Sequence, residues 1–221
     1  MHVRKTLATI LFSLFFAGLT ISSQPVIAQT PTADGSSDAS QSEKKDDDTN
    51  LDTHLYLLVG TNQDVDNTKL PVALDQVMKQ LRASLPFKNY RLAATLINRV
   101  KNDGRLSLKW IGGPLIVSTT ASTLNPSFNE FKVNTVKLVT DAGGRQVVRM
   151  EGFGFGARIP IQTSTTLASN APGAPIINYE PTGLNTDISM REGEAVVVGT
   201  LNVGPSGDAI ILVVSAKRTM K

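Results

Sequence analysis

The 221-residue chain contains no cysteine. Disulfides, thiolate metal sites and thiol nucleophiles are therefore excluded. A lipid anchor of the bacterial lipoprotein kind is excluded as well, because it requires a cysteine at the cleavage point. The fold must be held together by its apolar core alone.

Histidine is almost absent too. After the N-terminal segment the sequence holds only His54, which would have to serve as the base of any Ser-His-Asp triad. His54 with Asp52 is too few ligands for a metal site, and Glu192 and Glu194 flank Gly193 in a turn, where carboxylates are normally solvated. The sequence therefore predicts no catalytic, cofactor-binding or metal-binding residue, and a protein that is not an enzyme.

Long apolar runs are confined to the N-terminus. Residues 1–28 combine Arg4 and Lys5 with an apolar run over residues 7–21 and small residues before a cleavage point at Ala28. The run of about 15 residues is shorter than the roughly 20 that a membrane-spanning helix needs. The pattern indicates a cleaved signal peptide rather than an anchor. We expect a periplasmic, outer-membrane-associated or secreted protein with no transmembrane helix in the mature chain.

Acidic residues dominate the stretch that follows. Residues 29–53 carry seven acidic and two basic side chains and almost no large apolar one, which predicts a disordered acidic linker. Residues 54–221 carry 18 basic and 12 acidic side chains, a net charge of +6. Either the linker shields a basic face that meets an anionic surface, or it serves solubility and the bases are scattered. The sequence contains no cluster of aromatic and basic residues of the kind that indicates nucleic-acid binding.

Residues 54–221 have the length of a single domain. Apolar residues from Leu70 to Leu85 recur at steps of three and four, which predicts one amphipathic helix that ends at Pro86. A tight turn at Asp103-Gly104 predicts a hairpin between the strands on either side of it. The other predicted strands are 55–59, 115–120, 128–140, 146–160, 176–180, 184–190, 195–201 and 209–214, the last of them central. The fold class is mainly β, or α+β: an antiparallel sheet of about eight strands with one helix packed on it.

Glycine occupies every second position from 152 to 156, around Phe153 and Phe155. This spacing indicates a bent strand, or one that another backbone approaches closely. The two rings share one strand face and form either an exposed apolar patch for a partner or part of an ordinary core. The run is not a phosphate loop, because no helix follows it. Phe153, Phe155 and Arg158 are the candidate interface residues.

Three short motifs follow one another in the last third of the sequence. Ile159-Pro160-Ile161, a polar loop and Tyr179-Glu-Pro-Thr-Gly183-Leu184 precede Glu192-Gly-Glu-Ala-Val-Val-Val-Gly199. From Arg158 to Lys217 this order resembles the C-terminal β-rich module of the outer-membrane secretin family. The resemblance covers roughly 60 residues of the domain and lacks the family's gate element and further small domains. It implies a secretin-like fold fragment or an accessory of a secretion or pilus system, not a complete channel.

The expected function is therefore that of an exported, non-enzymatic cell-envelope protein. It would act through contacts with an envelope protein or with another copy of itself, in a secretin-type secretion or pilus system. The alternative is a soluble periplasmic ligand-binding domain with a largely apolar pocket between the helix and the sheet. An enzyme is the third possibility, and the sequence points to no catalytic residue for it.

Overall fold

The computed structural model describes residues 48–64, 69–113, 115, 125–165, 175–203 and 207–219, and the structural statements below concern these residues. The predicted signal peptide, residues 29–47 of the predicted linker and residues 116–120 of the strand predicted at 115–120 lie outside them.

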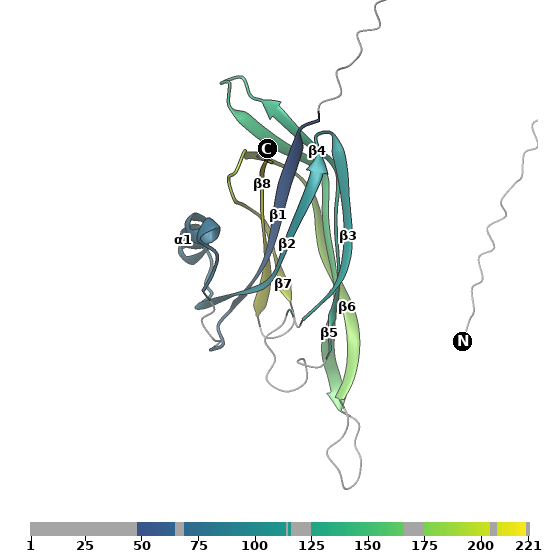
Figure 1. The fold of residues 1–221 in the computed structure, drawn as a ribbon. Coiled ribbons are helices and arrows are strands. Elements are labelled where there is room, and N and C mark those ends of the chain that lie inside the picture. Colours follow the sequence, from purple (N-terminus) through teal and green to yellow (C-terminus); the bar gives the residue numbers. More distant parts are fainter. Residues whose placement is uncertain are drawn as a thin grey trace, which may run out of the picture. The chain divides into compact units, whose positions relative to one another are not determined.

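Eight strands form two four-stranded antiparallel sheets, so the prediction of a mainly β fold is confirmed and that of a single sheet is wrong. The first sheet has the order β2-β1-β8-β7 and the second β3-β4-β5-β6. The two sheets share one apolar core to which both contribute side chains (Figure 1). The strands are β1 (Asn50–Thr61), β2 (Asn89–Lys101), β3 (Gly104–Gly112), β4 (Ser127–Thr140), β5 (Gln146–Thr165), β6 (Pro175–Arg191), β7 (Val196–Val203) and β8 (Asp208–Arg218).

The predicted amphipathic helix is a short 3-10 turn, η1 (Val72–Leu74), that continues into α1 (Asp75–Ser84). It lies on the face of the first sheet that points away from the second sheet (Figure 1). Leu85 adopts an extended backbone, as residues before proline usually do, and so the helix ends before Pro86. The buried side chains of this layer are Tyr56, Leu58, Leu74, Val77, Met78, Leu81, Tyr90, Ile211 and Val213.

The predicted hairpin between β2 and β3 is wrong, although the turn itself is present. Asp103 has a φ of 61°, as the turn signal requires. The turn carries the chain from one sheet to the other, so that β2 pairs with β1 and β3 with β4. The Asp103 amide donates to the Val136 carbonyl of β4 at 2.9 Å, which anchors the turn to the second sheet.

Two predicted boundaries also differ from the structure. β1 begins at Asn50, and Leu51 and Thr53 are buried, so residues 50–53 belong to the folded domain rather than to the linker. The strands predicted at 176–180 and 184–190 are one strand, β6, because Pro181 and Gly183 keep extended pairing with β5. Pro181 has no N–H to donate, and an edge strand tolerates this.

Phe153 and Phe155 lie in the shared core, with side chains 0% and 3% exposed. Phe153 packs against Phe131, with ring centroids 5.2 Å apart, and Phe155 lies 6.4 Å from Trp110. Gly152 has a φ of 63° and lies at a shift in the β5–β6 register, between Met150 and Phe153, so the strand is irregular where the glycine spacing predicted a bend. The two rings therefore form ordinary core, and the exposed patch predicted from them is not made by these side chains.

We predict that Phe153→Ala lowers the free energy of unfolding by about 3–5 kcal/mol, because a buried ring leaves a cavity. Urea unfolding followed by tryptophan fluorescence measures the effect. The matched control is Ile97→Ala, since Ile97 is 66% exposed on β2; it should cost less than about 1 kcal/mol. Similar losses in both variants would contradict the buried position of Phe153.

An ion pair ties the end of the second sheet to the end of the first. Glu192, in the turn after β6, accepts from Arg218 at the end of β8: Nε donates to Oε1 at 2.9 Å and Nη2 to Oε2 at 3.0 Å. The backbone amide of Arg218 also donates to Oε1 at 2.9 Å. These hydrogen bonds lower the pKa of Glu192 below its usual value near 4.5, against the opposing effect of partial burial.

A lowered pKa in the folded state stabilises the fold above the usual pKa and ceases to do so as pH falls through the lowered value. We therefore predict that Glu192→Gln lowers the urea midpoint at pH 7, and that the difference from wild type shrinks as pH falls below 4.5. Urea titrations at several pH values measure this. A difference that stays constant with pH would contradict the ion pair.

Candidate functional site

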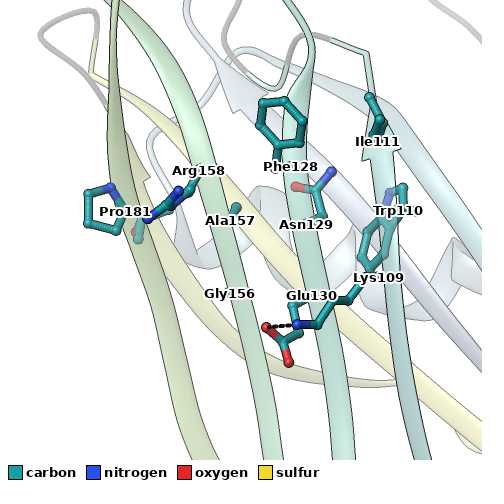
Figure 2. Close-up of a pocket in the computed structure, with 11 residues that line it drawn as sticks. Lys109, Trp110, Ile111, Phe128, Asn129, Glu130, Gly156, Ala157, Arg158 and Pro181 are labelled. Atoms are coloured by element: carbon teal, nitrogen blue, oxygen red, sulfur yellow. Dashed lines mark ion pairs between the residues drawn. The ribbon is translucent and has the colours of Figure 1, made fainter.

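The outer face of the second sheet carries a hollow of about 430 Å³ where β3, β4, β5 and β6 run side by side (Figure 2). Alternation along the strands decides which side chains point to it. On β4, Phe128 and Glu130 face outward, whereas Asn129 and Phe131 are buried. We call this site the outer hollow and define it by its outward residues, Lys109, Ile111, Phe128, Glu130, Gly156, Arg158 and Pro181.

Part of the floor of the outer hollow is backbone, because Gly156 has no side chain to fill it. Gly156 on β5 is paired with Gly183 on β6. A Cβ at Gly156 would meet nothing within 4 Å and would project into open space. A Cβ at Gly183 would collide with the backbone carbonyl oxygen of Phe155. One glycine thus leaves room for a ligand, and the other permits close approach of two strands.

Apolar side chains form the rim. Ile111, Phe128 and Tyr179 are 69%, 44% and 38% exposed, and the rings of Phe128 and Tyr179 pack with centroids 5.4 Å apart. In the register, Ile111, Phe128, Arg158 and Pro181 form one row across the four strands. Grouped exposed apolar side chains beside a concavity are typical of a contact surface for another molecule.

Charged groups border this rim on two sides. The Nζ of Lys109 lies 3.7 Å from Oε2 of Glu130, across the β3–β4 pair (Figure 2). Arg158 is exposed and lies directly opposite Phe128 in the register. The site therefore offers an apolar rim with a cation beside it, a combination that suits an apolar side chain next to an acidic one.

The hollow lies where the second sheet narrows. The pairing of β4 with β5 begins at Phe128 and Arg158, whereas β5 and β6 continue together as far as Thr165 and Pro175. Beyond the hollow the two strands therefore run on as a two-stranded ribbon past the start of β4 (Figure 1). The backbone edge of β5 next to the hollow has no strand partner among the described residues there.

The described residues hold no group of three or more His, Cys, Asp or Glu side chains that could bind a metal ion. His54 lies on β1, where its Nδ1 is 3.2 Å from the Tyr56 hydroxyl, away from the outer hollow. Glu192 is engaged by Arg218. The arrangement around the outer hollow is thus suited to binding, with no nucleophile held beside a base.

The structure separates the three residues predicted as an interface. Arg158 borders the outer hollow, whereas Phe153 and Phe155 point to the opposite side of β5, into the core. Sequence reasoning missed Phe128, Ile111 and Tyr179. One local signal was present: Phe128 shares the parity of Glu130 and Lys132, so an aromatic ring occupies a position on the polar face of its strand.

No family model and no curated protein sequence matches the chain. Solved secretin structures are similar to it at low identity. The secretin InvG of the Salmonella SPI-1 type III secretion injectisome is 10% identical over 78% of this chain and 65% of that chain, with a TM-score of 0.31. A chain of the Klebsiella pneumoniae type II secretion system outer membrane complex of PulD, PulS and the PulC HR domain is 11% identical over 78% of this chain and 39% of that chain, with a TM-score of 0.35.

The Vibrio cholerae type IV competence pilus secretin PilQ gives 9% identity, 78% and 58% coverage of the two chains, and a TM-score of 0.32. The chain thus spans less than two thirds of the length of these secretin chains. Its resemblance to secretin domains is weak and partial, as the motifs from Arg158 to Lys217 predicted. No helix among the described residues is long and apolar enough to cross a membrane.

Gly156 and Gly183, which are paired across β5 and β6, give a matched pair of substitutions. We predict that Gly156→Val leaves stability unchanged or raises it by about 0.5–1 kcal/mol, since glycine weakens a strand and the added side chain meets open space. Gly183→Val should destabilise, because its Cβ collides with the Phe155 carbonyl. Urea unfolding measures the free energy of unfolding of both variants. Equal changes in the two would contradict the geometry described for the two glycines.

Proposed function

We propose that the chain is an exported, non-enzymatic cell-envelope protein that acts through protein–protein contacts, as an accessory or component of a secretin-type secretion or pilus system. The signal-peptide pattern of residues 1–28 supports export. The motif order from Arg158 to Lys217 supports the connection to secretins. The observation that carries the contact function is the outer hollow, with its apolar rim and its backbone floor.

The partner we propose is an envelope protein that inserts an apolar side chain over Gly156, beside the ring of Phe128. An acidic group beside that side chain would meet Arg158. Large aromatic side chains around a central pocket provide most of the binding energy in many protein interfaces. The β5 edge beyond Arg158, which has no strand partner among the described residues, would offer backbone hydrogen bonds to an extended segment of the same partner.

A second candidate function is ligand binding in a pocket between the helix and the first sheet. A cavity of about 540 Å³ lies between α1 and the start of β2, and favours this alternative. The sequence led us to expect a largely apolar lining, whereas the lining of this cavity contains four lysine and arginine side chains.

The contact function can be tested in the envelope of the native host. The double variant Phe128→Ser with Gly156→Val removes a rim ring and fills the hollow. We predict that chemical cross-linking followed by detergent extraction recovers wild type in the high-mass complex of the host secretin, and that the double variant is depleted at least about tenfold, as expected for losing a central contact.

The control is Ile97→Ser, which removes an exposed apolar side chain from β2 in the first sheet. It should be recovered as wild type is, and both variants should unfold at urea concentrations close to that of wild type. Equal recovery of the double variant, or a wild type that stays monomeric and outside the secretin complex, would contradict the proposal.

A further inference from the structure

The cavity of about 540 Å³ beside α1 gathers positive charge from three separate segments. Lys69 precedes η1, Lys79 and Arg82 lie on α1, and Lys88 directly precedes β2. Among the described residues, Asp75 is the single carboxylate that lines the cavity. The described lining therefore has four cations against one anion, a formal charge of +3. We call this cavity the basic pocket.

The surrounding hydrogen bonds hold these segments in place without any ligand. Lys79 and Arg82 are three residues apart on α1 and so lie on one face of the helix. The Lys88 amide donates to Asn62 Oδ1 at 3.1 Å, and Asn89 Nδ2 donates to the Gln63 carbonyl at 2.8 Å. The start of β2 is therefore fixed to the end of β1, and Lys88 with it.

Tyr90 connects the floor of the basic pocket to the helix. Its hydroxyl donates to the Leu81 carbonyl at 3.1 Å, and its ring is buried. Burial raises the pKa of the Tyr90 hydroxyl, and the charge of Arg82 acts in the opposite direction. The Arg82 guanidinium is thus within electrostatic reach of the floor.

None of the four cations of the basic pocket forms an ion pair with another described residue. Four ammonium and guanidinium groups that border one cavity give it a positive potential, which attracts anions. Arginine and lysine donate strong charge-assisted hydrogen bonds to phosphate oxygens. The chemistry of the lining therefore favours an anion with more than one negative charge.

Apolar side chains complete the lining. Leu70, Val72 and Met78 border the cavity, and Val72 is 75% exposed at its edge. A simple inorganic anion would leave this apolar surface without a contact. An anion attached to a carbon skeleton would use both kinds of lining, as is typical of small-molecule sites.

We propose that the basic pocket binds a phosphate ester of small-molecule size, carried either by a free organic phosphate or by the headgroup of an anionic phospholipid. This inference goes beyond the proposed contact function. The basic pocket lies on the outer face of the first sheet and the outer hollow on the outer face of the second, so the two sites can fail independently.

Two probes distinguish the two sources of the phosphate. Isothermal titration calorimetry with glycerol 3-phosphate at low ionic strength measures binding of a free ester. Flotation with phosphatidylcholine vesicles, with and without phosphatidylglycerol, measures binding to a lipid headgroup. The test variant is Lys79→Gln with Arg82→Gln, because glutamine is a good helix former and removes the charge alone.

We expect the test variant to weaken binding by about tenfold or more for each cation removed, with a fold and urea midpoint close to wild type. The matched control is Arg105→Gln with Arg149→Gln, two exposed cations on β3 and β5 of the second sheet. This control should bind as wild type does, although it loses the same charge.

If wild type binds glycerol 3-phosphate and the test variant does not, the result supports a free organic phosphate as the ligand. Binding only to vesicles with phosphatidylglycerol, again lost in the test variant, supports a lipid headgroup. The proposal is overturned if wild type binds neither probe, or if the test variant and the control weaken binding equally, since attraction would then follow overall charge rather than the basic pocket.

Discussion

The burial of β1 and β8 on both faces is the constraint on which the rest of the structure depends. Residues 208–214 of β8 are all buried, and so are residues 55–61 of β1. Along β8, Ile210 and Leu212 enter the core shared by the two sheets, whereas Ile211 and Val213 pack under the helix. One central pair of strands thus holds three layers together in a chain that has no disulfide.

Features of the fold that depend on neighbouring residues could be predicted from the sequence. The three- and four-residue apolar spacing of the helix, the Pro86 stop, the Asp103 turn and the apolar run over residues 209–214 of β8 all follow from local patterns. The assignment of strands to two sheets could not be predicted, because alternation shows that a face is buried but not against which strand. The sequence therefore predicted a hairpin at Asp103, where the chain in fact changes sheets.

The outer hollow was harder to predict, because it depends on the absence of a side chain at Gly156. The regular glycine spacing around Phe153 did indicate a bend or a close approach of backbones, and the strand is irregular at Gly152. The hollow itself lies over Gly156, whose neighbours on β4 and β6 are set by the register of the long β4–β5–β6 pairing. The same pairing turns both phenylalanines inward and Arg158 outward. Parity within β5 could separate Arg158 from the two rings, but only the register could bring it beside Phe128.

The order β2-β1-β8-β7 places the first and last strands of the domain side by side. Residues paired between β1 and β8 are separated by about 150 positions or more, as in Gly60 with Ala209. Contacts between such distant residues make folding slow. A chain that emerges from a ribosome or an export channel with its N-terminus first cannot close the first sheet until its final strand has emerged. The topology therefore delays closure of the first sheet until the whole domain has emerged, whereas β3 to β6, which are neighbours both in the sequence and in the second sheet, do not have to wait for β8.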